Sequence, residues 1–83
     1  MLKHKLLFSV SVHYKNGEKQ KLALVETDRE FVIAPYYISE EEGWRGSGAY
    51  LSKESYDVCR ILDIFVRQLY DELDSAFVEK ITL

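Results

Sequence analysis

The sequence contains little cysteine, proline or glycine, the residues that cross-link a chain, interrupt its regular structure or make it flexible. Its 83 residues include one cysteine, Cys59, one proline, Pro35, and four glycines. A single cysteine excludes an intrachain disulfide and a zinc site built from several cysteines, and it fits a reducing cytoplasm. No apolar run approaches the roughly 18 residues of a membrane span, and no small-residue cleavage site follows the apolar start. We therefore expect a single cytoplasmic domain over residues 1–83.

A catalytic constellation is also missing. The two histidines, His4 and His13, fall on the first predicted strand, and Cys59 falls on the apolar face of a predicted helix, so no nucleophile has a base within reach. The glycine-rich stretch GWRGSG, residues 43–48, lacks the Lys-Ser or Lys-Thr ending of a phosphate-binding loop. The carboxylates of the helix are spread as on a solvated face. We predict a protein that is not an enzyme, with no metal and no cofactor.

What is present is apolar surface and an uneven charge. Hydrophobic residues make up 47% of the chain and aromatic residues 13%, enough for a packed core. Residues 1–25 carry five lysines against one glutamate, a net charge of +4. Residues 26–83 carry six basic against thirteen acidic residues, a net charge of −7. The folded chain should therefore present two electrostatically different surfaces.

The first half of the sequence predicts a β-hairpin. Apolar and polar residues alternate from Leu6 to Lys15, and Asn16-Gly17 is a strong turn signal. A two-residue turn would mix the faces. A three-residue loop with Gly17 in a left-handed bulge instead sets Phe8 opposite Leu24, which makes one face apolar and the other polar and basic. We predict the bulged loop and a second strand over residues 19–26.

The rest of the chain predicts two more strands and a helix. A third strand, residues 30–38, contains Pro35 and should be irregular there. Residues 49–51 predict a short fourth strand, and Ser52 is a good helix N-cap. The fold class is therefore α+β: a curved, four-stranded antiparallel sheet followed by one long C-terminal helix, in the order β-β-β-β-α. Residues 77–83 either extend this helix or form a short strand.

The predicted helix has more apolar positions than one stripe needs. The main stripe comprises Val58, Cys59, Leu62, Phe65, Val66, Leu69, Leu73 and Ala76. Ile61 and Ile64 lie outside it, towards the polar side. Their burial calls for a partner subunit or for a folded-back C-terminus.

Residues 30–62 resemble a known family. Their pattern is an apolar strand ending in Tyr36-Tyr37, a polar loop, the basic glycine-containing element Arg45-Gly46-Ser47-Gly48, a strand ending in Leu51-Ser52, and Tyr56 in the first helical turn. It is similar to the single-stranded-DNA-binding domain of transcriptional positive cofactor four and its small bacterial and phage relatives. The resemblance implies a homodimer packed through its helices, with Ile61, Ile64 and Phe65 at the interface, and a basic channel for the nucleic acid.

The candidate nucleic-acid-binding residues lie on the polar face of the hairpin and in the loop. They are Ser9, Ser11, His13, Lys15, Lys19, Lys21, Tyr37, Trp44 and Arg45. Lysines and hydroxyls contact backbone phosphates, and an aromatic ring stacks on an unpaired base. Two alternatives stay open here: Trp44 either stacks on a base or caps the core, and either Tyr36 or Tyr37 points outward.

We therefore expect a homodimeric protein that binds single-stranded DNA largely without sequence preference, in transcription, replication or recombination. The alternative is a small phage-type inhibitor or adaptor that engages a host protein through Glu40, Glu41 and Glu42 and the acidic helix face. A structural dimer without a ligand is a third possibility.

Overall fold

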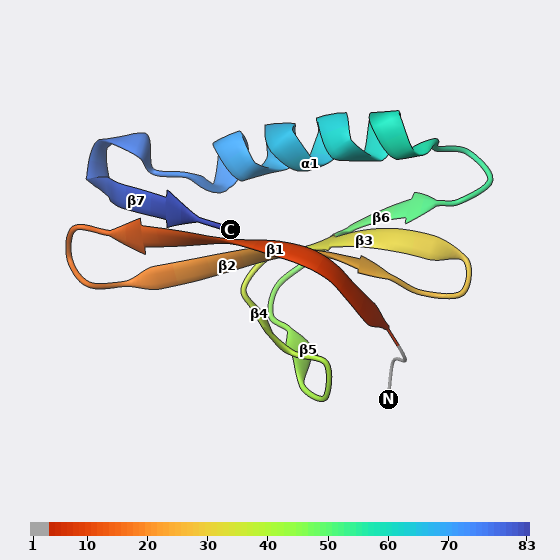
Figure 1. Cartoon of the computed structure of the whole chain (residues 1–83), viewed down its shortest axis with the longest axis horizontal. Helices are drawn as coiled ribbons and strands as arrows, with labels where there is room; N and C mark the ends of the chain where they lie inside the picture. The colour runs from red at the N-terminus through yellow and green to blue at the C-terminus, as the bar shows by residue number, and fades with distance from the viewer. Residues whose placement is uncertain (1–3) are drawn as a thin grey trace.

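The architecture is organised around one long strand, β1 (Lys5–Tyr14), which pairs with β2 (Lys19–Glu26) on one side and β7 (Val78–Thr82) on the other (Figure 1). A computed structural model describes residues 4–83. Five strands form an antiparallel sheet in the order β6-β3-β2-β1-β7, and β4 and β5 form a separate two-stranded sheet. The elements are β1 (Lys5–Tyr14), β2 (Lys19–Glu26), β3 (Glu30–Ala34), β4 (Tyr37–Ser39), β5 (Gly43–Trp44), β6 (Ala49–Ser52), α1 (Val58–Glu72), the 3₁₀ turn η1 (Ser75–Phe77) and β7 (Val78–Thr82).

The hairpin is built as predicted from Phe8 to its turn, whereas a register shift between Leu6 and Phe8 places Leu6 against the core on the opposite face from Phe8. Phe8 pairs with Leu24 and Val10 with Leu22. The backbone N–H of Tyr14 donates to the carbonyl oxygen of Glu18 at 2.8 Å, and Gly17 is left-handed with φ +91°. Since only glycine adopts this conformation without steric cost, Gly17 sets the bulged loop and with it the division of the sheet into two faces.

The prediction of four strands followed by a long C-terminal helix is wrong. The chain leaves the helix at Leu73, turns through η1 and adds β7 beside β1, where Ser11 pairs with Thr82. A fifth strand is favourable there because the outer edge of β1 would otherwise leave its backbone groups unpaired. Of the two possibilities for residues 77–83, the short strand is confirmed.

The third predicted strand is interrupted at the proline. β3 ends at Ala34, Pro35 is buried, and Tyr36 has a positive φ of 50°. Proline has no N–H for the ladder, and the left-handed residue after it turns the chain away from the sheet. The chain therefore leaves the main sheet to form the β4–β5 hairpin and returns to it as β6, next to β3.

The helix covers one face of the sheet with a different stripe from the one predicted. Ile61 is 2% exposed and Phe65 is 3% exposed, and both belong to the core cluster that contains Val10, Leu22 and Ile33. Ile64 and Leu69 pack against the same core. The assignment of Ile61 and Phe65 to a dimer interface is therefore wrong, because the sheet of their own chain covers them, and Ile64 is partly buried against the same core. The exposed apolar stripe is instead Val58, Leu62, Val66 and Tyr70.

The helix also begins later than predicted. Its N-cap is Asp57, whose side chain accepts a hydrogen bond from the backbone N–H of Arg60 at 2.8 Å. Ser52 instead closes a turn, since its hydroxyl oxygen accepts from the backbone N–H of Glu54 at 3.2 Å. The turn is needed because the chain must rise from the edge strand β6 to the level of the helix before α1 can begin (Figure 1).

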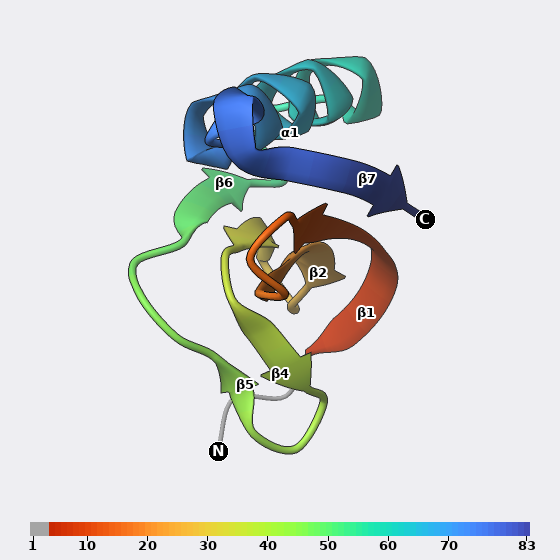
Figure 2. The same ribbon diagram turned by 90° about the vertical axis from the view of Figure 1, so that its left-hand side faces the viewer.

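The second face of the sheet carries a smaller core. Ala23, Val25, Val32 and Ala34 are fully buried there together with Tyr37, and Leu6 and Trp44 pack against them. Figure 2 shows α1 on one side of the main sheet and the β4–β5 hairpin on the other. The face predicted to be polar and basic is therefore apolar in part, and the small hairpin covers that part. The uncovered part holds the polar residues of β1 and β2.

Candidate nucleic-acid interface

The polar face of the β1–β2 hairpin brings together five of the predicted site residues. Ser11 pairs with Lys21, and His13 pairs with Lys19, with Ser9 two positions before Ser11 on the same face. Directly paired residues of antiparallel strands share a face, so the hydroxyl, imidazole and ammonium groups lie side by side. The predicted grouping of Ser9, Ser11, His13, Lys19 and Lys21 is confirmed as geometry.

Strand β7 extends this polar face with two residues that were not predicted. Lys80 pairs with His13 and Thr82 pairs with Ser11. His13 Nε2 and Thr82 Oγ1 are 3.2 Å apart, within hydrogen-bonding distance. Lys80 adds a cation on the opposite side of His13 from Lys19. In the sequence, only the alternation in VEKIT, residues 78–82, indicates a strand. This alternation does not show that the strand pairs with β1, so Lys80 and Thr82 could not be assigned to the polar face.

A groove of about 410 Å³ lies between the β2 end of this face and the small hairpin. Its lining consists of Lys19, Lys21, Tyr36, Tyr37, Ile38, Glu42 and Arg45. Three cationic side chains therefore face one carboxylate, a net charge of +2. The acidic loop contributes Glu42 to this groove, and Glu40 and Glu41 are exposed outside its lining. A groove with this balance attracts anions.

The outward tyrosine is Tyr36 and not Tyr37. Tyr37 is 6% exposed, and its hydroxyl lies 3.1 Å from His4 Nε2. Burial raises the pKa of the Tyr37 phenol, and the nearby Glu40 raises it further. Of the two alternatives, Tyr37 is the inward ring, and it does not offer the exposed face that a stacking contact needs. Tyr36 is 53% exposed, because its left-handed backbone turns the side chain out at the edge of the groove.

Trp44 caps the second core. It is half-buried against that core, and its ring meets the His4 ring edge-on with centroids 5.4 Å apart. Gly48 passes so close that an added Cβ would lie 3.5 Å from the indole nitrogen and 3.0 Å from the carbonyl oxygen of Ile33. Of the two alternatives for Trp44, the structure therefore favours the capping one. The sequence does not reveal which residues contact Trp44, so it could not distinguish the two alternatives.

Arg45 and Lys15 differ in their relation to the groove. Arg45 is exposed and lines it, and its backbone N–H donates to the carbonyl oxygen of Tyr36 at 3.3 Å, which ties the two flanks together. Lys15 lies at the exposed tip of the β1–β2 hairpin, where its backbone N–H donates to the carbonyl oxygen of Phe77 at 2.8 Å. Lys15 is therefore not part of the groove.

The described part of the chain, residues 4–83, shows neither a metal-binding cluster nor a membrane-spanning helix. These residues contain no group of three histidine, cysteine or acidic side chains that could hold a metal ion. None of their helices is long and apolar enough to cross a membrane. No family model, curated protein or solved structure matches the chain.

Proposed function

We propose that the chain binds single-stranded nucleic acid through the groove beside the small hairpin. The observation that carries the proposal is the juxtaposition of three cations, Lys19, Lys21 and Arg45, with the exposed ring of Tyr36. Cations along a groove neutralise successive phosphates, and an exposed aromatic ring stacks on any unpaired base. This combination supports recognition of a single strand, whose bases are free to stack, over a duplex.

In this mechanism the residues have distinct tasks. Lys19, Lys21 and Arg45 contact the phosphates, and Tyr36, instead of Trp44 or Tyr37, stacks on a base. Ser9, Ser11 and His13 extend the path along β1, and Lys80 adds a cation at its far end. Hydroxyl contacts to phosphates position a strand without reading its sequence. The proposed role is in transcription, replication or recombination in the cytoplasm, with no enzymatic step, in keeping with the resemblance to the positive cofactor four family.

The test is a titration of a fluorescent oligo-dT and its duplex at two salt concentrations. Neutralisation of three phosphates on a single strand gives a slope of log K against log salt of about −2 per chain. Binding that is tighter for the single strand and falls with that slope supports the proposal. Absence of measurable binding at low salt rules it out.

A homodimer is part of the proposal, through the exposed stripe Val58, Leu62, Val66 and Tyr70. A helix of a monomer usually exposes polar residues on its outer face, so this stripe is surplus apolar surface. Light scattering after size exclusion tests it: Leu62→Glu should convert a dimer to a monomer, and a wild-type protein that is already monomeric excludes it.

The alternative function, binding of a host protein as an inhibitor or adaptor, has one observation in its favour. Glu40, Glu41 and Glu42 are all exposed at the tip of the small hairpin. Exposed carboxylates at one tip suit a basic protein surface. Capture of one stable host protein, abolished when these three glutamates are changed to glutamine and accompanied by no binding to oligo-dT, would favour this function over the first.

A further inference from the structure

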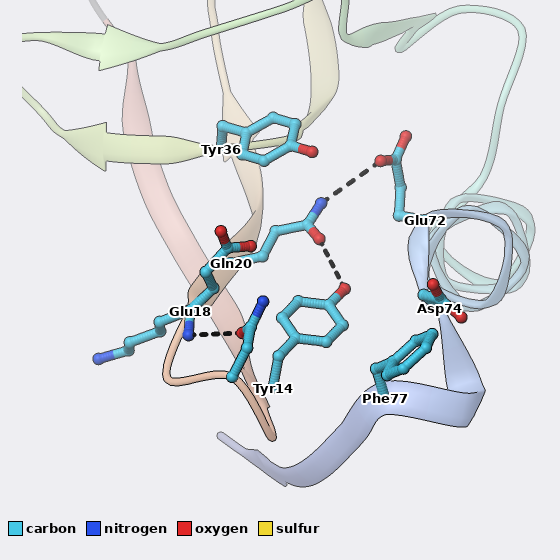
Figure 3. Close-up of a pocket in the computed structure, with 9 residues that line it drawn as sticks. Tyr14, Glu18, Gln20, Tyr36, Glu72, Asp74 and Phe77 are labelled. Carbon is cyan, nitrogen blue, oxygen red and sulfur yellow. Dashed lines mark hydrogen bonds between the residues drawn. The ribbon is translucent and has the colours of Figure 1, made fainter.

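A second pocket lies next to the cationic groove and has the opposite character (Figure 3). Its volume is about 320 Å³, at the lower end of the usual range for small-molecule sites of roughly 300–1,000 Å³. The end of the β1–β2 hairpin, the bend at Tyr36 and the exit of the helix converge there. The side chains that matter are Tyr14, Gln20, Tyr36, Glu72, Asp74 and Phe77.

A buried amide organises the pocket. Gln20 is 6% exposed, and its Oε1 accepts a hydrogen bond from the hydroxyl of Tyr14 at 3.0 Å. Its Nε2 donates to Glu72 Oε2 at 3.3 Å, and Gln68 Nε2 donates to Glu72 Oε1 at 3.1 Å. Each carboxylate oxygen of Glu72 thus receives one neutral amide donor. Glu72 is held in place with lone pairs free on both oxygens.

Glu72 has no cationic partner among residues 4–83. The ion pairs in this part of the chain are Lys53 with Glu26 and Arg67 with Asp63. Glu18 and Asp74 also line the pocket, and Lys19 at its boundary is the one cation in its lining. The pocket therefore carries three carboxylates against one ammonium, a net charge of −2, whereas the neighbouring groove carries +2.

Aromatic rings form the remaining walls. Figure 3 shows Gln20 between the rings of Tyr36 and Tyr14, with Phe77 on the side of the helix exit. Tyr36 and Phe77 are both more than half exposed, so ring surface is open to a ligand. The face of an aromatic ring attracts a cation, and a carboxylate accepts hydrogen bonds from its N–H groups. These walls offer little to an anion or a neutral polar molecule.

We propose that this pocket binds an organic cation, a primary ammonium or guanidinium group on a slender chain. The headgroup donates to Glu72 and Asp74, and the chain lies along the rings of Tyr36 and Phe77. Both a free polyamine and a lysine or arginine side chain of another protein present this chemistry. The pocket differs from the nucleic-acid groove in charge, and the two share only Lys19 and Tyr36 in their linings. The carboxylates that define this site, Glu72 and Asp74, lie outside the groove, so its test does not depend on the nucleic-acid proposal.

The test is a titration of the ¹⁵N-labelled full chain, followed by two-dimensional NMR. The probes are spermidine, acetyl-lysine amide and acetyl-arginine amide, with 1,5-pentanediol as a neutral control and magnesium chloride at matched ionic strength. We expect saturable shifts of the side-chain amides of Gln20 and Gln68, while the indole N–H of Trp44 stays still. Saturation by spermidine alone identifies a free amine as the ligand, and saturation by a capped amino acid identifies a partner side chain.

Two variants and a matched control make the result decisive. Glu72→Gln should weaken binding about tenfold, because a charge-assisted hydrogen bond is lost. Phe77→Leu, at an exposed position that tolerates change, should weaken it about three- to fivefold. Glu54→Gln makes the same change in net charge outside the pocket lining and should have less than about a twofold effect. The proposal is overturned if no probe saturates, if the diol or magnesium shifts the same signals, or if both glutamate variants weaken binding equally.

Discussion

The ring of Phe8 on β1 meets the ring of Phe65 on α1 at a steep angle, with centroids 4.9 Å apart and planes inclined by 62°. This contact joins the first strand to the helix across the main core, which also contains Leu24 and Ile61. Edge-to-face pairs of this kind add stabilisation beyond the area they bury. The helix is therefore held to its own sheet by Phe65, and the stripe on its other side is free to contact a partner.

The first prediction concerns this division of the helix. Phe65→Ala should lower the free energy of unfolding by about 3–5 kcal/mol, because it removes a buried ring and leaves a cavity. Leu62→Ala, at a position that is 41% exposed, should cost less than about 1 kcal/mol in a dilute monomer. Urea unfolding followed by circular dichroism measures both. Equal costs would mean that the helix presents a different face to the sheet.

The second prediction concerns the cations of the groove. Changing both Lys19 and Lys21 to alanine should reduce the salt slope of oligo-dT binding by about 1.4, and Arg45→Gln should reduce it by about 0.7. Arg60 is exposed on the helix and does not line the groove, so Arg60→Gln is the matched control and should leave the slope unchanged. If Arg60→Gln and Arg45→Gln had the same effect, only the overall charge would matter.

The third prediction separates stability from binding at Tyr36. Its φ of 50° is a left-handed conformation that costs a tyrosine roughly 1–2 kcal/mol and costs glycine nothing. Tyr36→Gly should therefore leave the free energy of unfolding unchanged or raise it slightly, while oligo-dT binding falls through loss of the stacked ring. Tyr36→Phe keeps the ring and should keep the binding. A large loss of stability in Tyr36→Gly would mean that the ring supports the fold instead.

The fourth prediction is a pH dependence that originates in one ion pair. Lys53 Nζ lies 2.7 Å from Glu26 Oε2, and this hydrogen bond and charge hold the pKa of Glu26 below its ordinary value of 4.5. Because the pKa is lower in the folded state, the contribution of Glu26 to stability is present above pH 4.5 and disappears as the pH falls through the folded value.

The measurement compares urea midpoints from pH 7 down to pH 3. Lys53→Met should flatten the part of this profile that belongs to Glu26. Arg67→Met breaks the exposed pair with Asp63, whose geometry is looser at 3.3 Å, and should change the profile less. A profile that Lys53→Met leaves unaltered would assign the acid sensitivity to other carboxylates.

Local sequence signals were sufficient for the hairpin. Alternation from Leu6 to Lys15 and the Asn16-Gly17 turn are encoded within twenty residues, so the register from Phe8 onward, the bulge at Gly17 and the grouping of the polar residues could be predicted. The register shift between Leu6 and Phe8 was not predicted. The short strand at residues 49–51 was also predicted, and the structure extends it to Ser52. These features depend on neighbours in the sequence and on little else.

The features that were predicted wrongly depend on contacts between distant segments. The helix has two apolar stripes, and periodicity does not reveal which of them a sheet will cover. The place of β7 depends on the free edge of β1, and the choice between Tyr36 and Tyr37 depends on a turn at Pro35 that buries the second ring against the sheet. Lys80 and Thr82 belong to the candidate site only because β7 pairs with β1.

The pairing of β7 with β1 also constrains the order in which the protein can acquire its structure. His13 and Thr82 are 69 residues apart, so the sheet closes through one of the longest loops the chain can make. Such closures are slow relative to hairpin formation. On the ribosome, the β1–β2 hairpin can form early, but the edge of β1 stays open until residues 78–82 have emerged. During this interval the nascent chain has an unpaired strand edge, which can pair with a strand of another nascent chain. Synthesis is therefore the stage at which misassembly of this fold is most favoured.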